Sequence, residues 1–154
     1  MNRIDMTINS LQTKGRKMLS PYLTAGDPSP KHTVMLMHHL VEAGADLLEI
    51  GIPFSDPMAE GPIIQAAMER ALAYGIHCEQ VFAMVAEFRQ KDKDTPIVLM
   101  GYMNPVEIYG YRRFAEQAKA AGVDGTIIVD MPPEESEVIR ALWAEHALYH
   151  IYLC

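Results

Sequence analysis

The sequence predicts an α/β fold built on a parallel sheet, of the (β/α)8 TIM-barrel type. Short apolar runs alternate with longer segments of helical periodicity, a pattern typical of parallel strands joined by crossover helices. One apolar run, residues 46–52, carries a single carboxylate, Glu49, and a proline-rich turn after it brings a second, Glu60. The strings EAGAD (42–46) and AAGVD (120–124) precede two of the runs. This repeat favours a barrel over an open doubly wound sheet.

The N-terminal part of the chain is expected to form a covering helix and then the first strand. Ile4, Ile8 and Leu11 stand at helical spacing, which predicts a short helix over residues 3–14. After a Gly-Arg-Lys break, the run MLSPYLTAG predicts the first strand over residues 18–26.

A turn and a helix connect the first strand to the second. We expect Ser29 to cap the helix and Pro30 to take its first position, where a missing N–H costs nothing. The helix then covers 31–43 and ends at Gly44, a typical helix-terminating residue. The second strand covers 46–52.

The remaining elements continue the alternation. Helix 62–73 has the clearest helical periodicity in the chain, with apolar residues at i, i+3, i+4, i+7 and i+8. Asn104-Pro105 predicts a turn after the third strand. We expect further helices over 78–90, 111–121 and 134–146, and strands over 96–102, 126–130 and 149–154.

The predicted strands number five in 154 residues, whereas a complete (β/α)8 barrel needs eight strands in about 250 residues. We therefore interpret residues 1–154 as a single, partial barrel domain. Such a sheet cannot close, and it leaves two strand edges unpaired. The expectation is a fragment of a longer protein or a truncated gene product, with a complete five-strand domain the least favoured of the three.

Composition excludes several classes of function. The net charge of −7 argues against nucleic-acid binding, which calls for a basic patch. No stretch approaches the roughly 20 apolar residues of a membrane span, and the N-terminus lacks the apolar core of a signal peptide. Cys78 and Cys154 predict no disulfide framework, and the scattered histidines suggest no metal site. We expect a cytoplasmic protein.

Residues 48–65, LEIGIPFSDPMAEGPIIQ, resemble the signature of the tryptophan synthase alpha subunit. The family has aspartate where this chain has Glu60. Further motifs follow the family order at matching spacing, so the sequence is identified as a member from about residue 15 to residue 154. They are PYLTAGDPS (21–29), MGYMNP (100–105), VDMPPEES (129–136) and IYLC (151–154).

The resemblance implies retro-aldol cleavage of indole-3-glycerol phosphate to indole and glyceraldehyde 3-phosphate, in L-tryptophan biosynthesis. Glu49 matches the residue that takes the proton of the substrate hydroxyl and protonates the indole ring carbon. Glu60 matches the residue that accepts the indole N–H or stabilises its positive charge. Two carboxylates in different environments suit such acid–base work. The resemblance implies no metal or organic cofactor in this subunit, and pyridoxal phosphate only in the partner beta subunit.

Four further matched residues are assigned to substrate binding. Tyr22 and Tyr102 are expected to line the indole pocket, with ordinary barrel packing as the open alternative. Thr24 and Asp130 stand at strand ends that face the same mouth.

Another four matched residues are assigned to the partner interface. In the family the corresponding loops face the beta subunit of an alpha2beta2 tetramer and help to pass indole to it. A turn cap is the alternative for the first of them. The residues are Asp56, Pro57, Asn104 and Pro105.

Two differences from the family pattern bear on activity. Glu60 extends the carboxylate by one methylene, and misplacement by about 1 Å can cost roughly 100-fold in rate. In the family the substrate phosphate is held by loops after strands seven and eight, beyond the five strands predicted here. We therefore predict little or no lyase activity for this polypeptide alone.

Two other interpretations stay open. The chain could be a catalytically inactive alpha-like module that only docks on a tryptophan synthase beta subunit. It could also be a different α/β-barrel enzyme that acts on another sugar phosphate, although the PFSDP string argues against this.

Overall fold

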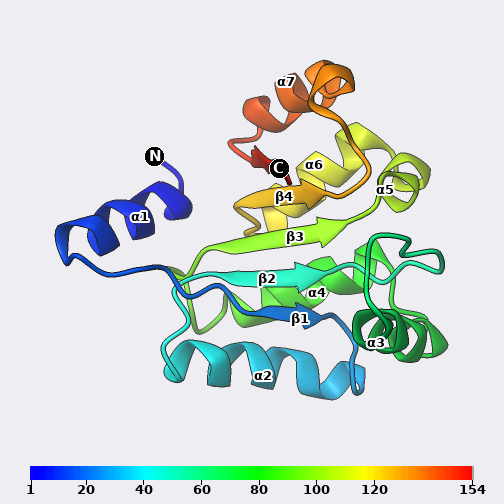
Figure 1. The fold of residues 1–154 in the computed structure, drawn as a ribbon, viewed down its shortest axis with the longest axis horizontal. Helices are drawn as coiled ribbons and strands as arrows, with labels where there is room; N and C mark the ends of the chain where they lie inside the picture. The colour runs from blue at the N-terminus through cyan, green and yellow to red at the C-terminus, as the bar shows by residue number, and fades with distance from the viewer. Residues whose placement is uncertain (154) are drawn as a thin grey trace.

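The computed structural model describes residues 1–153 and contains one sheet of five parallel strands in the order β1-β2-β3-β4-β5 (Figure 1). Each strand pairs with its neighbour in the chain. A doubly wound sheet would reverse its strand order at a switch point, so this order is that of a barrel wall. The predicted fold class is confirmed for the part of a barrel covered here. The strands are β1 (Tyr22–Thr24), β2 (Leu48–Gly51), β3 (Ile97–Gly101), β4 (Gly125–Ile128) and β5 (Tyr149–Ile151).

The helices form a layer on one side of the sheet. In that layer α2 packs on α4, α4 on α6, and α6 on α7. Figure 1 shows α1 at the amino ends of the strands, with α3 and α5 toward the carboxyl ends. The helices are α1 (Arg3–Thr13), α2 (Pro30–Glu42), α3 (Pro62–Ala73), α4 (Cys78–Phe88), α5 (Met103–Tyr109), α6 (Tyr111–Ala121) and α7 (Glu137–Glu145), with a 3-10 turn η1 (Pro133–Glu135).

The two faces of the sheet bury different clusters. The face toward the helices carries the larger core, to which β2 contributes Leu48 and Ile50. The inner face carries a smaller cluster that includes Leu47 of the residues next to β2 and Ile4 of α1. Because side chains alternate along a strand, Glu49 shares the inner face with Leu47. The inner cluster consists of Ile4, Leu47, Val98, Met100 and Ile127, with Tyr22, Val129 and Ile151 packed on it.

Most predicted elements are present, with shifts at their ends. The first strand is wrong in length, because only residues 22–24 of the predicted 18–26 pair with β2. Ile8 is exposed, so the buried face of α1 is Ile4 and Leu11 alone. The fifth strand ends at Ile151, and Cys154 lies outside the described residues.

The predicted Asn104-Pro105 turn is wrong, because both residues lie in helix α5. Pro105 is tolerated in the first turn of that helix, where its missing N–H removes no intrahelical bond. Ser29 does stand at the N-cap of α2 with Pro30 following, but its side chain makes no capping bond. Its hydroxyl lies 2.7 Å from Nδ1 of His32 instead.

The repeated strings have a structural meaning at the amino ends of the strands. Gly44 and Gly122 both turn the chain with positive φ, 109° and 94°. The aspartate two residues later accepts a backbone N–H from the residues before β1 in one case and from the first residue of β3 in the other. Leu19 N donates to Asp46 (2.9 Å), and Ile97 N donates to Asp124 (2.9 Å). Each repeated string therefore marks a hydrogen bond that joins two neighbouring strand segments at the amino ends of the strands.

Candidate active site at the carboxyl ends of the strands

Glu49 lies half-buried on the inner face of β2, beside Tyr22 of the neighbouring strand. Burial raises the pKa of the Glu49 carboxyl, and the negative charge of Glu60 raises it further. Within residues 1–153 no lysine or arginine forms an ion pair with either glutamate. A carboxyl with a raised pKa keeps a proton to higher pH than an exposed one, as a general acid requires.

Tyr22 extends from β1 over Gly51 of β2. A Cβ atom at position 51 would overlap the hydroxyl and the ring of Tyr22, so any larger residue there requires the tyrosine to move. The Tyr22 hydroxyl lies 2.9 Å from Oγ1 of Thr24. Burial raises the pKa of Tyr22 to about 12; the bond to Thr24 opposes that rise, and the charges of Glu60 and Glu49 add to it. The tyrosine therefore stays neutral beside the two carboxylates.

Glu60 reaches the same region from the segment between β2 and α3. Tyr102 donates its hydroxyl hydrogen to Oε1 of Glu60 at 3.3 Å and accepts the N–H of Ala59 at 3.1 Å. Burial raises the pKa of Tyr102, and the hydrogen bond from Ala59 opposes the rise. The Glu60 side chain is partly exposed, unlike the tyrosine that holds it. The structure thus brings together both predicted catalytic residues and both predicted tyrosines.

The predicted substrate-binding residues differ in how far they can reach a ligand. Tyr102 is only 1% exposed and packs on Phe54, with ring centroids 5.2 Å apart, so it supports Glu60 more than it lines a pocket. Thr24 is 3% exposed, and its hydroxyl is engaged with Tyr22. Asp130 follows β4 and accepts the N–H of Met103 at 2.7 Å, so its carboxylate caps helix α5.

The four residues predicted to face a partner do not share one environment. Asp56 and Asn104 are exposed, Pro105 is partly buried and Pro57 is buried. Asn104 and Pro105 border a groove of about 580 Å³ between α5 and the start of α4. Asp56 accepts the hydroxyl of Ser55 at 2.7 Å, which is a contact between adjacent side chains and not a cap on a backbone N–H. The partner assignment of these four residues stays a prediction.

Sequence reasoning missed Gly51, whose lack of a side chain lets Tyr22 lie against β2. The signal was available, because a glycine inside a strand often marks the close approach of another group.

Sequence reasoning also missed Phe54 and Gln65, which hold Tyr102 and the backbone of Glu60 in place. Phe54 packs on Tyr102, and Gln65 donates its amide to the backbone carbonyl of Glu60 at 2.7 Å. Phe54 belongs to the segment that carries Glu60, and Gln65 lies in the first turns of α3.

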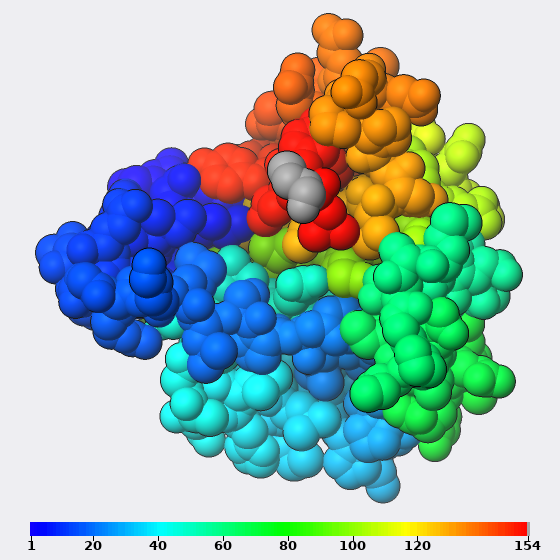
Figure 2. Space-filling view, viewed as in Figure 1, coloured from blue at the N-terminus to red at the C-terminus, as the bar shows by residue number. Residues whose placement is uncertain are grey.

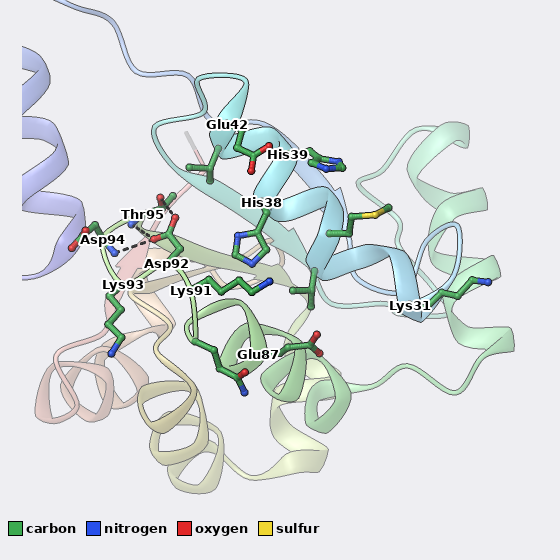
Figure 3. A pocket seen from close by; sticks show the side chains of 14 residues that line it. Lys31, His38, His39, Glu42, Glu87, Lys91, Asp92, Lys93, Asp94 and Thr95 are labelled. Atoms are coloured by element: carbon green, nitrogen blue, oxygen red, sulfur yellow. Dashed lines mark hydrogen bonds between the residues drawn. The ribbon is translucent and has the colours of Figure 1, made fainter.

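A larger groove, of about 1070 Å³, lies between α2, α4 and the segment before β3, on the outer layer of helices (Figure 3). Its walls mix cations and acids, among them Lys31, Lys91 and Glu42. Neither Glu49 nor Glu60 lines it. The groove is therefore separate from the two carboxylates.

The described part of the chain offers no group of three or more His, Cys, Asp or Glu side chains placed to hold a metal ion. Among the helices of residues 1–153, none is both long and apolar enough to cross a membrane.

Burial raises the pKa of the Cys78 thiol to about 11. Cys78 is therefore a buried, protonated side chain at neutral pH.

Fold and site together define a class: a partial α/β barrel with two interacting carboxylates at the end where barrel active sites lie. The sequence profile of the family described as "Tryptophan synthase alpha chain" matches residues 8–154. The chain belongs to the tryptophan synthase alpha chain family.

Several relatives and solved structures agree with this membership. The tryptophan synthase alpha chain of Legionella pneumophila (strain Corby) is 64% identical over 154 residues, which are 100% of this chain and 57% of the relative. That of Nitrosococcus oceani is 61% identical over 153 residues, 99% of this chain and 56% of the relative. The chain thus spans little more than half the length of these curated relatives.

Two solved structures show the same fold. The crystal structure of tryptophan synthase subunit alpha from Legionella pneumophila str. Paris has a TM-score of 0.99 at 63% identity, covering 100% of this chain and 59% of that one. The tryptophan synthase complex from Pyrococcus furiosus contains a chain with a TM-score of 0.85 at 42% identity, covering 89% of this chain and 56% of that one. The barrel wall is therefore common to both.

Proposed function

We propose that this chain carries the acid–base pair for cleaving indole-3-glycerol phosphate to indole and glyceraldehyde 3-phosphate. Protonated Glu49 first donates its proton to the indole ring carbon that bears the side chain, so that positive charge develops on the ring. The resulting carboxylate then takes the proton of the substrate hydroxyl as the carbon–carbon bond breaks, its electron pair returns to the ring and the carbonyl of the aldehyde forms. Glu60 accepts a hydrogen bond from the indole N–H and stabilises the positive charge that develops on the ring.

The raised pKa of Glu49 is the observation that supports this proposal most. The rise comes from burial and from the charge of Glu60, which are features of a site rather than of a solvated surface. A carboxyl whose pKa is shifted toward neutrality can both accept and donate a proton within one turnover. The two carboxylates differ in environment, because Glu49 lies on the sheet and Glu60 on a partly exposed segment bonded to Tyr102.

The remaining assignments follow from the same proposal. Tyr22 supplies aromatic area beside Glu49, with its hydroxyl bonded to Thr24. Proton transfers between carboxylates and substrate need no organic cofactor or metal in this chain, and pyridoxal phosphate belongs to the beta subunit. That subunit is the proposed partner in an alpha2beta2 assembly, contacted by the segment around Asp56 and by Asn104. The Pyrococcus furiosus relatives are described as a tryptophan synthase complex and an a2b2 complex.

The direct test is indole release from indole-3-glycerol phosphate. We expect little turnover by the 154-residue chain alone, because barrels of this type frequently bind a substrate phosphate with the loops after strands seven and eight, and the sheet described here has five strands. A fusion of this chain to the remaining residues of the Legionella pneumophila relative supplies the rest of the barrel. That fusion should turn over, and Glu49→Gln should lower its kcat by about 100-fold or more.

Two results would count against the proposal. A folded fusion that releases no indole argues against the reaction. A fusion in which Glu49→Gln is as fast as the parent argues against the role of Glu49.

One observation favours a second candidate, a module that only docks on the beta subunit. The groove beside α5 is bordered by the exposed Asn104 and Ile108, which a partner could cover. In that case the fusion would activate a beta subunit without releasing indole. Indole release by the fusion, measured together with its effect on the activity of a beta subunit, therefore separates the two candidates.

A further inference from the structure

We propose that Tyr102 is a positioning residue that holds the Glu60 carboxylate toward Glu49. This inference deepens the proposed function, because it explains how the longer glutamate side chain is placed at that site. It assigns to Tyr102 a role different from the pocket lining predicted from the sequence.

Packing holds the ring of Tyr102 in place, independently of the hydrogen bonds that its hydroxyl makes. The residue directly follows β3, it is only 1% exposed, and Phe54 packs against it. A side chain held this firmly has little freedom to move its hydroxyl. That hydroxyl accepts the N–H of Ala59 and donates to Oε1 of Glu60. Its donor and acceptor capacity is thus directed at two consecutive residues of one segment.

The backbone of Glu60 is held by other groups. Its N–H donates to the carbonyl of Pro57 at 3.0 Å, and its carbonyl accepts the amide of Gln65 at 2.7 Å. With the backbone fixed, the remaining freedom is that of the glutamate side chain, whose rotamers would otherwise spread into solvent. The bond from Tyr102 restricts one carboxylate oxygen and leaves the other for a ligand.

The placement has a measurable consequence at Glu49, because the charge of Glu60 raises the pKa of that carboxyl. The neutral hydroxyls of Tyr22 and Tyr102 lie in the same group of interacting side chains. If Tyr102 holds Glu60 in place, removing its hydroxyl must weaken the effect of Glu60 on Glu49. The interaction between the two carboxylates then depends on a third residue.

A double-mutant cycle with 13C-labelled glutamate carboxyls measures this dependence by NMR in the 154-residue chain. The pKa of Glu49 is recorded in the parent, Glu60→Gln, Tyr102→Phe and the double variant. Glu60→Gln should lower the pKa of Glu49 in the parent. In the Tyr102→Phe background the same change should lower it by less than about half as much.

Tyr109→Phe is the matched control, since Tyr109 packs through its ring on Phe82 and Phe114. It should leave the effect of Glu60→Gln on Glu49 unchanged. An equal effect of Glu60→Gln in the parent and in Tyr102→Phe would overturn the proposal. So would the absence of any effect in the parent.

A second measurement serves if Tyr102→Phe fails to fold. In the unsubstituted chain, the 13Cζ resonance of Tyr102 should follow the ionisation of Glu60, and Glu60→Gln should remove that inflection. A Tyr102 resonance that ignores Glu60 would contradict the proposal. No substrate enters either measurement, so an inactive chain can still support the positioning role, and an active one can still refute it.

Discussion

The two ends of the sheet carry buried or half-buried carboxylates in opposite settings. At the amino end, Asp124 is 3% exposed and accepts hydrogen bonds from Arg3 (2.9 Å), Arg89 (3.0 Å) and the N–H of Ile97 (2.9 Å). Toward the carboxyl end, Glu49, the second residue of β2, faces the negative charge of Glu60, which follows that strand. Figure 2 shows α1 at one side of the molecule and the segment after β2 at the other.

Asp124 and Glu49 therefore differ in role. The charge of Asp124 stabilises the fold, whereas the carboxyl of Glu49 is available for chemistry. Asp124 gains two cationic partners and ties α1, α4 and β3 together. Within the described residues Glu49 has no lysine or arginine partner, and burial and the charge of Glu60 disfavour its charged form. A paired buried carboxylate is costly to remove, whereas an unpaired one costs stability while it is charged.

Asp124→Asn should have the largest effect on stability. It leaves Arg89 without its buried partner, and burial already lowers the pKa of Arg89 to about 10. Removing one member of a buried pair typically costs about 3–5 kcal/mol. Urea unfolding of the purified chain measures the loss. Asp94→Asn, at an exposed aspartate, is the control and should change little. A loss below about 1 kcal/mol for Asp124→Asn would mean that the buried ion pair contributes little to stability, and would contradict the structural role given to Asp124.

Gly51→Ala should have the next largest effect, and it acts at the carboxyl end. The new methyl group would overlap the ring of Tyr22, which must move away from β2. Overpacking of this kind costs about 1–3 kcal/mol in unfolding free energy. Tyr22→Leu removes the overlapping ring atoms, so the double variant should recover part of the loss. Denaturant midpoints of the three variants test this, and purely additive losses would contradict the contact.

Arg70→Ala should have the smallest effect. Arg70 donates to both carboxylate oxygens of Asp27, at 2.6 and 3.0 Å, and joins α3 to the segment after β1. The arginine is exposed, so the ion pair should contribute little to the free energy of unfolding. Thermal unfolding in low and high salt measures the contribution. Equal destabilisation of Arg70→Ala at both salt concentrations would show that lost packing, not charge, was responsible.

Much of the fold could be predicted because its signals are local. Helices 62–73 and 111–121 agree with α3 and α6 at both ends, since periodicity and terminating residues are properties of the segment itself. The first strand could not be delimited, because strand pairing depends on β2 and not on the apolar run. The Asn104-Pro105 error has a similar cause: Asp130, distant in sequence, supplies the cap that lets α5 begin at Met103.

The candidate site shows the same division. The motif placed Glu49 and Glu60 at one end of the sheet, and the structure brings both to that region. The support given by Tyr102 and the need for glycine at position 51 depend on contacts across strands. A sequence pattern indicates which residues carry chemistry, but the groups that hold them come from other elements.

The measurement that tests the contrast most directly is the pH dependence of stability in Glu49→Gln. The folded chain raises the pKa of Glu49, so stability is lost as pH rises from the unfolded pKa of glutamate through the folded one. Glutamine carries no charge and avoids that loss. We predict that Glu49→Gln unfolds at higher urea than the parent at pH 7. The difference should shrink toward about pH 4, where the parent is largely protonated in both states. A variant less stable than the parent at pH 7 would mean that charged Glu49 is paired and structural, as Asp124 is, and would contradict the account.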